Sequence, residues 1–154
     1  PRVPRRGGNV RRGLVTQAIH TLMHHPAAAA DLAPALEAGL AGIGEDELGG
    51  IGTLRELLAA MRAQPKRTGS QFLEAWRERP EFARLGQLQA EPCLLDAAQA
   101  AAELSGTIGR LTLQVSTERQ ARRYDLLAQK VGEGTASEAE RKEFQSLARR
   151  PSPR

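Results

Sequence analysis

The sequence lacks the residues that a disulfide-bonded or membrane-spanning protein needs. It has one cysteine, Cys93, which excludes an intrachain disulfide and a CxxC-type zinc site. We expect Cys93 to be a small, buried or half-buried side chain. No stretch approaches the roughly 18 uninterrupted apolar residues of a membrane span, and no apolar run follows the basic N-terminus as in a signal peptide. The sequence therefore favours a soluble, cytoplasmic protein, and its start at Pro1 favours a fragment of a longer chain.

Aromatic residues are scarce, at 3% of the chain, whereas alanine is abundant. Strands favour aromatic and β-branched residues, and alanine is the best helix former. No alternating apolar run of strand length is present either. The predicted fold class is therefore all-α: a helical bundle followed by a long helix and a C-terminal two-helix hairpin.

Recognisable catalytic motifs are also missing. The chain has no GxxxxGK[ST] phosphate loop, no GxGxxG after a strand and no GxSxG elbow, and its acidic residues show no pairing at catalytic spacing. His20 and His24 have the i, i+4 spacing of a zinc site, but Thr21 stands where the HExxH motif has glutamate, and no third ligand is evident. The sequence therefore predicts no catalytic site, no metal and no cofactor in this chain.

Positive charge is in mild excess, with a net charge of +4, and it gathers near the N-terminus in a segment without acids. We expect residues 1–10 to be a disordered basic linker and residues 151–154 a disordered tail. The charge leaves a basic helical nucleic-acid-binding domain as an alternative function. Against it, no helix carries a continuous basic stripe and no aromatic stacking platform exists. Direct binding of nucleic acid stays open.

Apolar spacings of three and four residues predict a helical bundle over residues 11–117. Expected helices span residues 10–24, 27–32, 34–38, 54–63 and 81–90, and a further helix begins at residue 68 and ends before residue 80. Residues 39–52 hold six glycines and are expected to form a loop. Thr53 with Glu56, and Thr68 with Gln71, have the spacing of capping boxes and predict two helix starts.

Residues 94–131 contain no proline and predict a long helix. Its apolar seam consists of Leu104, Ile108, Leu111 and Val115. Gly106 and Gly109 weaken this helix and favour a kink or a break there. Residues 116–123 hold a single apolar residue, which predicts a polar neck that packs on no core.

A two-helix hairpin is predicted for residues 118–150. Apolar spacing resumes at Tyr124, glycines follow at Gly132 and Gly134, and Ser137 with Glu140 has capping-box spacing. Two short helices bury too little surface to be stable alone, so their apolar residues either pack back on the bundle or dock on another protein. The polar neck favours docking on a partner.

Three segments together resemble the C-terminal domain of bacterial DNA primases. The first is LVTQAIHTLMHHPAAAAD at 14–31, which in that family is an opening helix ended by a polar residue and proline. The second is GIGTLRELLAAMRAQP followed by RTGSQFLEAWRE, within 50–78. The third, RYDLLAQKVGEGTASEAERKEFQSLARR at 123–150, is similar to the family's terminal hairpin. The resemblance covers residues 11–150 and depends on the order and spacing of these segments.

The resemblance implies a domain that does not synthesise primers itself but binds the N-terminal domains of the hexameric replicative helicase. That contact recruits primer synthesis, an RNA polymerase activity of the parent protein, to the bacterial replication fork. Zinc and magnesium sites would lie in domains outside this chain. A second implied partner is the acidic C-terminal tail of single-stranded DNA-binding protein.

The resemblance also implies two sets of binding residues. Helicase contacts carried over to the hairpin are Arg123, Tyr124, Leu127, Val131, Lys142, Phe144 and Leu147. Residues carried over for the acidic tail are Arg11, Arg12, Val15, Thr16, Ile19, Arg84 and Leu88. This second set matches loosely, because Thr16 and Gln87 stand where a more basic side chain would suit an acidic tail.

Overall fold

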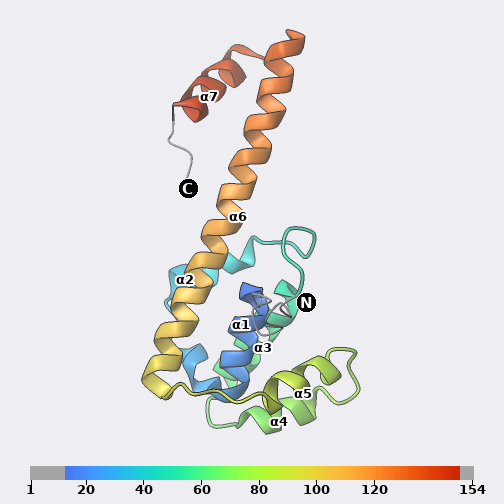
Figure 1. Ribbon diagram of the computed structural model, residues 1–154, viewed down its shortest axis with the longest axis vertical. Coiled ribbons are helices and arrows are strands. Elements are labelled where there is room, and N and C mark those ends of the chain that lie inside the picture. Colours follow the sequence, from blue (N-terminus) through green and yellow to red (C-terminus); the bar gives the residue numbers. More distant parts are fainter. Residues whose placement is uncertain (1–12, 150–154) are drawn as a thin grey trace, which may run out of the picture. The chain divides into compact units, whose positions relative to one another are not determined.

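The computed structural model describes residues 13–149, which form helices joined by short loops (Figure 1). The elements are α1 (Leu14–His24), the 3₁₀ helix η1 (Pro26–Asp31), α2 (Pro34–Ala41), α3 (Ile51–Ala63), α4 (Gly69–Ala75), α5 (Phe82–Ala90), α6 (Ala97–Glu133) and α7 (Glu138–Ala148). Residues 13–149 contain no strand, so the all-α prediction is confirmed. The predicted terminal segments at 1–10 and 151–154 lie outside the described residues. The first helix begins at Leu14, with Gly13 as its cap residue, later than the start predicted at residue 10.

The chain divides into two compact units between Thr112 and Leu113, inside α6. The sequence prediction set the end of the bundle at residue 117, within the polar part of the same helix. None of the helices between residues 13 and 149 combines the length and apolar character that a membrane crossing needs.

The first unit is built around α1, which packs against η1, α3, α4 and α5. Its large, fully buried side chains come from faces with helical spacing, as the sequence predicted. They include Leu22, Met23, Leu54, Leu57, Leu58, Met61, Leu104, Ile108 and Leu111. Trp76 is also buried, and the guanidinium carbon of Arg79 lies 3.6 Å from the centre of its ring, a cation–π contact.

Helix α2 extends to Ala41, past the end predicted at residue 38. The sequence interpretation took Gly39 as the start of a loop, but this glycine lies inside the helix. A Cβ atom at Gly39 would lie 3.1 Å from the Cγ2 atom of Thr112. Glycine is thus used for close packing of α2 on α6, and it does not end the helix.

The capping box predicted at Thr53 and Glu56 is wrong, because α3 begins two residues before Thr53, at Ile51. Gly50 is the cap residue, with a left-handed φ of 86°. Glu45, from the preceding loop, accepts hydrogen bonds from the backbone N–H groups of Gly50 (2.8 Å) and Gly52 (3.1 Å). A carboxylate from outside the helix therefore satisfies donors that a capping serine or threonine would satisfy.

The capping box at Thr68 and Gln71 is confirmed: each side chain accepts a hydrogen bond from the other residue's backbone N–H. Gly69, the first residue of α4, is buried against the end of α1. A Cβ atom there would lie 1.8 Å from the carbonyl oxygen of Met23. Helices α1 and α4 can therefore pack this closely only with glycine at position 69. Helix α4 ends at Ala75, before the stop predicted at residue 80, because the N–H of Trp76 bonds in a tight turn to the oxygen of Leu73.

The long helix is a single α6 of 37 residues, about 55 Å at a rise of about 1.5 Å per residue. It begins at Ala97, where Asp96 and Gln99 exchange reciprocal backbone-to-side-chain hydrogen bonds of 3.0 and 2.8 Å. Helical structure continues through Gly106 and Gly109, so the break that these glycines favoured does not occur. The preceding loop holds the half-buried Cys93 and an almost fully exposed Leu94.

The second unit contains the end of α6, a tight turn and α7. Gly134 has a φ of 74°, its N–H donates to the oxygen of Val131, and the N–H of Thr135 donates to the oxygen of Lys130. This pair of bonds is a Schellman motif, in which a left-handed glycine ends a helix. Ser137 and Glu140 then form the predicted capping box at the start of α7. The sequence predicted a turn at residues 132–134, but Gly132 and Glu133 lie inside α6, so the turn begins at Gly134, whereas the predicted capping box is confirmed.

Candidate functional site

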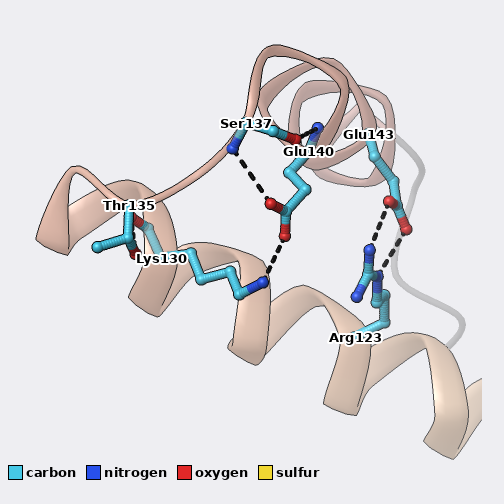
Figure 2. Close-up of polar contacts among 6 residues, drawn as sticks. All are labelled: Arg123, Lys130, Thr135, Ser137, Glu140 and Glu143. Carbon is cyan, nitrogen blue, oxygen red and sulfur yellow. Dashed lines mark hydrogen bonds and ion pairs between the residues drawn. The ribbon is translucent and has the colours of Figure 1, made fainter.

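Two ion pairs join α7 to α6 across the hairpin (Figure 2). The guanidinium of Arg123 donates two hydrogen bonds of 2.9 Å to the two carboxylate oxygens of Glu143. Nearer the turn, Nζ of Lys130 lies 2.7 Å from Oε2 of Glu140. A two-pronged arginine–carboxylate pair fixes direction as well as distance, so these contacts set the register of the two helices.

Both carboxylates are held in the charged form. Hydrogen bonds from Lys130 and from the backbone N–H of Ser137 lower the pKa of Glu140 to about 2. The hydrogen bond from Arg123 lowers the pKa of Glu143 below its ordinary value, and the same contact raises the pKa of the Arg123 guanidinium. The hairpin therefore keeps its ion pairs throughout the neutral pH range.

The apolar side chains of the hairpin fall into two groups. Leu127 is fully buried, and Ala136 is buried near the turn. The rings of Tyr124 and Phe144 stack with centroids 5.0 Å apart and planes 25° from parallel. Leu127 therefore belongs to the small interior of the hairpin, whereas Tyr124 keeps 38% of its surface exposed.

Several large apolar side chains of the second unit keep a third or more of their surface exposed. Leu113 is 67% exposed, Leu126 44% and Val131 37%. Leu113, Tyr124 and Val131 are separated by eleven and seven residues, close to three and two helical turns, so they lie along one face of α6, the face on which Tyr124 stacks against Phe144 of α7. We call Leu113, Tyr124 and Val131 the outer stripe. An exposed line of large apolar groups is a common mark of a protein-binding surface.

The structure brings most of the residues predicted for helicase binding together in the hairpin, with different exposures. Arg123, Tyr124 and Phe144 lie at the contact of the two helices, and these three residues and Leu147 are partly exposed. Lys142 lies on the outer side of α7, 3.9 Å from Glu138, and takes no part in the inter-helix contacts described. The sequence interpretation missed Leu113 and Leu126. The only sign of them in the sequence was that each is a large apolar residue outside the expected seam.

A second candidate site is a cavity of about 520 Å³ in the first unit. It is lined by Val15, Thr16, Ile19, Glu45, Gly49, Gly50, Thr53, Pro80, Glu81, Arg84, Leu85 and Leu88. All five described residues predicted for an acidic tail line it: Val15, Thr16, Ile19, Arg84 and Leu88. Arg11 and Arg12 lie outside the described residues.

The cavity has an apolar floor and a charged rim. Val15, Ile19, Leu85 and Leu88 are buried and form the apolar part of its wall. The guanidinium of Arg84 donates a hydrogen bond of 2.8 Å to the hydroxyl of Thr16. An apolar floor beside a guanidinium suits a ligand with a hydrophobic group and a negative charge.

The histidines are used for helix packing. Each Nε2 atom lies within hydrogen-bonding distance of a backbone carbonyl: His20 to Glu91 (3.2 Å), His24 to Leu88 (3.3 Å) and His25 to Leu95 (2.8 Å). Through these bonds α1 holds the end of α5 and the segment that leads to α6. Among residues 13–149 no group of three or more His, Cys, Asp or Glu side chains is arranged to hold a metal ion.

Comparisons with known proteins agree with this architecture. The model of the family described as "DNA primase DnaG DnaB-binding" matches residues 15–147. A search of curated proteins found no match. Among solved structures, the C-terminal domain of the DnaG primase from Vibrio cholerae is similar in fold, with a TM-score of 0.55 and 23% sequence identity. The similarity covers 91% of this chain and 99% of the Vibrio cholerae domain.

Proposed function

Because the chain belongs to the DnaB-binding family of the DNA primase DnaG, we propose that it binds the replicative helicase through the outer stripe of its hairpin. The family match carries the helicase-interaction role, since it covers most of the chain and includes both helices of the hairpin. The exposed apolar residues of α6 support the finer assignment to this surface. The role of the domain is to hold primer synthesis at the replication fork.

The hairpin suits docking because it is rigid before it meets a partner. Two ion pairs, a capping box and a Schellman turn set its geometry. A preorganised surface loses little conformational freedom on binding, so more of the interaction free energy remains as affinity. Tyr124 is a suitable central contact, since tyrosine combines a large apolar area with a polar group and is enriched at binding hot spots.

The test is calorimetric titration of the chain into the matching hexameric helicase. Val131→Asp and Leu113→Asp each put a charge on the outer stripe, and we expect each to weaken binding by about tenfold or more. Leu94→Asp is the matched control, because Leu94 is a leucine of the first unit that is 95% exposed. Circular dichroism checks that the variants keep their helical content.

Equal affinity of all three variants and the wild type would remove the outer stripe from the contact. If the wild type fails to bind helicase but binds single-stranded DNA with an affinity that falls steeply with salt, the nucleic-acid alternative takes its place.

We propose as a second role that the cavity beside α1 receives an acidic peptide, such as the tail of single-stranded DNA-binding protein. Support comes from the meeting of Val15, Thr16, Ile19, Arg84 and Leu88 around one cavity with an apolar floor. Titration with a peptide that ends in Asp-Phe should shift the NMR signals of α1 and α5. Unchanged signals at millimolar peptide would exclude this role.

A further inference from the structure

The side chains that line the cavity carry more negative than positive charge, which does not favour an acidic ligand. Its lining includes two carboxylates, Glu45 and Glu81, and one guanidinium, Arg84. Nε of Arg79 lies 3.6 Å from Glu81, so a cation outside the lining offsets part of the Glu81 charge. Arg84 is already hydrogen-bonded to Thr16. Of the two carboxylates, Glu45 is therefore the one whose charge Arg79 does not offset.

Glu45 is fixed at the rim of the cavity. Its Oε1 accepts from the N–H of Gly50 and its Oε2 from the N–H of Gly52, and these two backbone bonds lower its pKa below the ordinary value. Arg55 adds a smaller electrostatic effect in the same direction, but its guanidinium donates to the oxygen of Leu40. At neutral pH Glu45 is thus an ionised group that occupies backbone donors beside the cavity.

We infer that Glu45 is a specificity-determining residue that weakens the binding of acidic peptides in this cavity. It acts in two ways: its charge repels a second carboxylate, and it holds N–H groups that such a carboxylate would use. The inference rests on the proposed peptide-binding role of the cavity. It follows that the cavity binds an acidic peptide less tightly than it would with an uncharged side chain at position 45.

The test compares four proteins: the wild type, Glu45→Gln, Glu81→Gln and Asp46→Asn. The Glu45→Gln change removes the charge and keeps one of the two oxygens that accept from Gly50 and Gly52, so it also frees one backbone N–H. Asp46→Asn is the matched control, because Asp46 is an exposed acid in the same loop and does not line the cavity. Each protein is titrated with an acidic peptide ending in Asp-Phe and with a less acidic version in which the acids upstream of Asp-Phe are replaced by the corresponding amides.

We expect Glu45→Gln to bind the acidic peptide roughly three- to tenfold more tightly than the wild type at low salt. The gain should shrink as salt is added and should be smaller for the less acidic peptide. Glu81→Gln should give a smaller gain, and Asp46→Asn almost none. Thermal unfolding and the NMR signals of Gly50 and Gly52 report whether the start of α3 keeps its structure in each variant.

Equal or weaker binding of the acidic peptide by folded Glu45→Gln overturns the inference and leaves the cavity as a peptide site. An equal gain in Asp46→Asn also overturns it, because the effect would then belong to the charge of the loop in general. If neither peptide binds any of the four proteins, the peptide-binding role of the cavity fails together with the inference.

Discussion

At the scale of single residues, Glu140 joins three parts of the hairpin. Its carboxylate pairs with Lys130 of α6 and accepts from the N–H of Ser137, while its own N–H donates to the Ser137 hydroxyl (Figure 2). One side chain therefore both starts α7 and holds it against α6. Its protonation state is coupled to the folding of the hairpin.

The pKa of Glu140 is lowered from 4.5 to about 2, so the folded hairpin favours the charged form. The resulting stabilisation is present above about pH 4.5 and is lost as the pH falls through about 2. We expect the NMR signal of the Glu140 carboxyl carbon to titrate near pH 2, and Lys130→Met to move the midpoint upward. A wild-type midpoint at the ordinary value would contradict the contacts described.

A methyl group added at Gly69 would clash with the backbone of α1. We expect Gly69→Ala to lower the free energy of unfolding by about 1–3 kcal/mol, because its Cβ would overlap the oxygen of Met23. Gly86→Ala is the matched control inside α5, where open space surrounds the glycine, and it should be neutral or stabilising by up to about 1 kcal/mol. Urea unfolding followed by Trp76 fluorescence measures both.

At the scale of elements, the glycines of α6 and its turn have opposite roles. Nothing lies within 4 Å of a Cβ added at Gly106 or Gly109, so alanine there should stabilise α6 by about 0.5–1 kcal/mol at each position. Gly134 has a φ of 74°, and alanine there should destabilise the hairpin by about 1–2 kcal/mol. Thermal unfolding measures these shifts, and a shift of the same sign at all three positions would contradict this account.

Helix boundaries show what the sequence could and could not predict. Thr68 with Gln71 and Ser137 with Glu140 start helices as predicted, because capping boxes involve only local contacts. The start of α3 was mispredicted because Glu45 caps it from outside the helix. Asp96 with Gln99 makes the same reciprocal bonds and was missed, although aspartate is also a preferred cap residue.

Like the helix boundaries, the candidate sites could be predicted from the sequence only in part. Periodicity placed Tyr124 and Leu127 on the apolar side of α6, but it could not tell that α7 and the turn enclose Leu127 and leave Tyr124 accessible. That distinction depends on which neighbour covers each residue. The cavity combines residues from α1, α3, α5 and intervening loops, so its carboxylates Glu45 and Glu81 became part of it only in three dimensions.

At the scale of the whole molecule, the two proposed sites lie in different units. We expect Val131→Asp to weaken helicase binding and leave the affinity for the Asp-Phe peptide unchanged. Leu88→Asp, in the floor of the cavity, should have the reverse effect. The double variant should show the sum of the two effects, since separate sites without shared contacts act additively. Calorimetry of the wild type, the two single variants and the double variant with each partner measures these effects. If either single variant weakened the binding of both partners, the two sites would be coupled.

The distribution of aromatic residues gives each unit its own optical signal. The chain has one tryptophan, Trp76, buried in the first unit beneath Arg79, and one tyrosine, Tyr124, stacked on Phe144 in the second. Tryptophan emission therefore reports on the bundle, and tyrosine absorbance reports on the hairpin. Tryptophan emission excited at the red edge, where tyrosine does not absorb, follows the bundle of the unlabelled protein alone, and the tyrosine difference spectrum, once the tryptophan contribution is subtracted, adds the response of the hairpin.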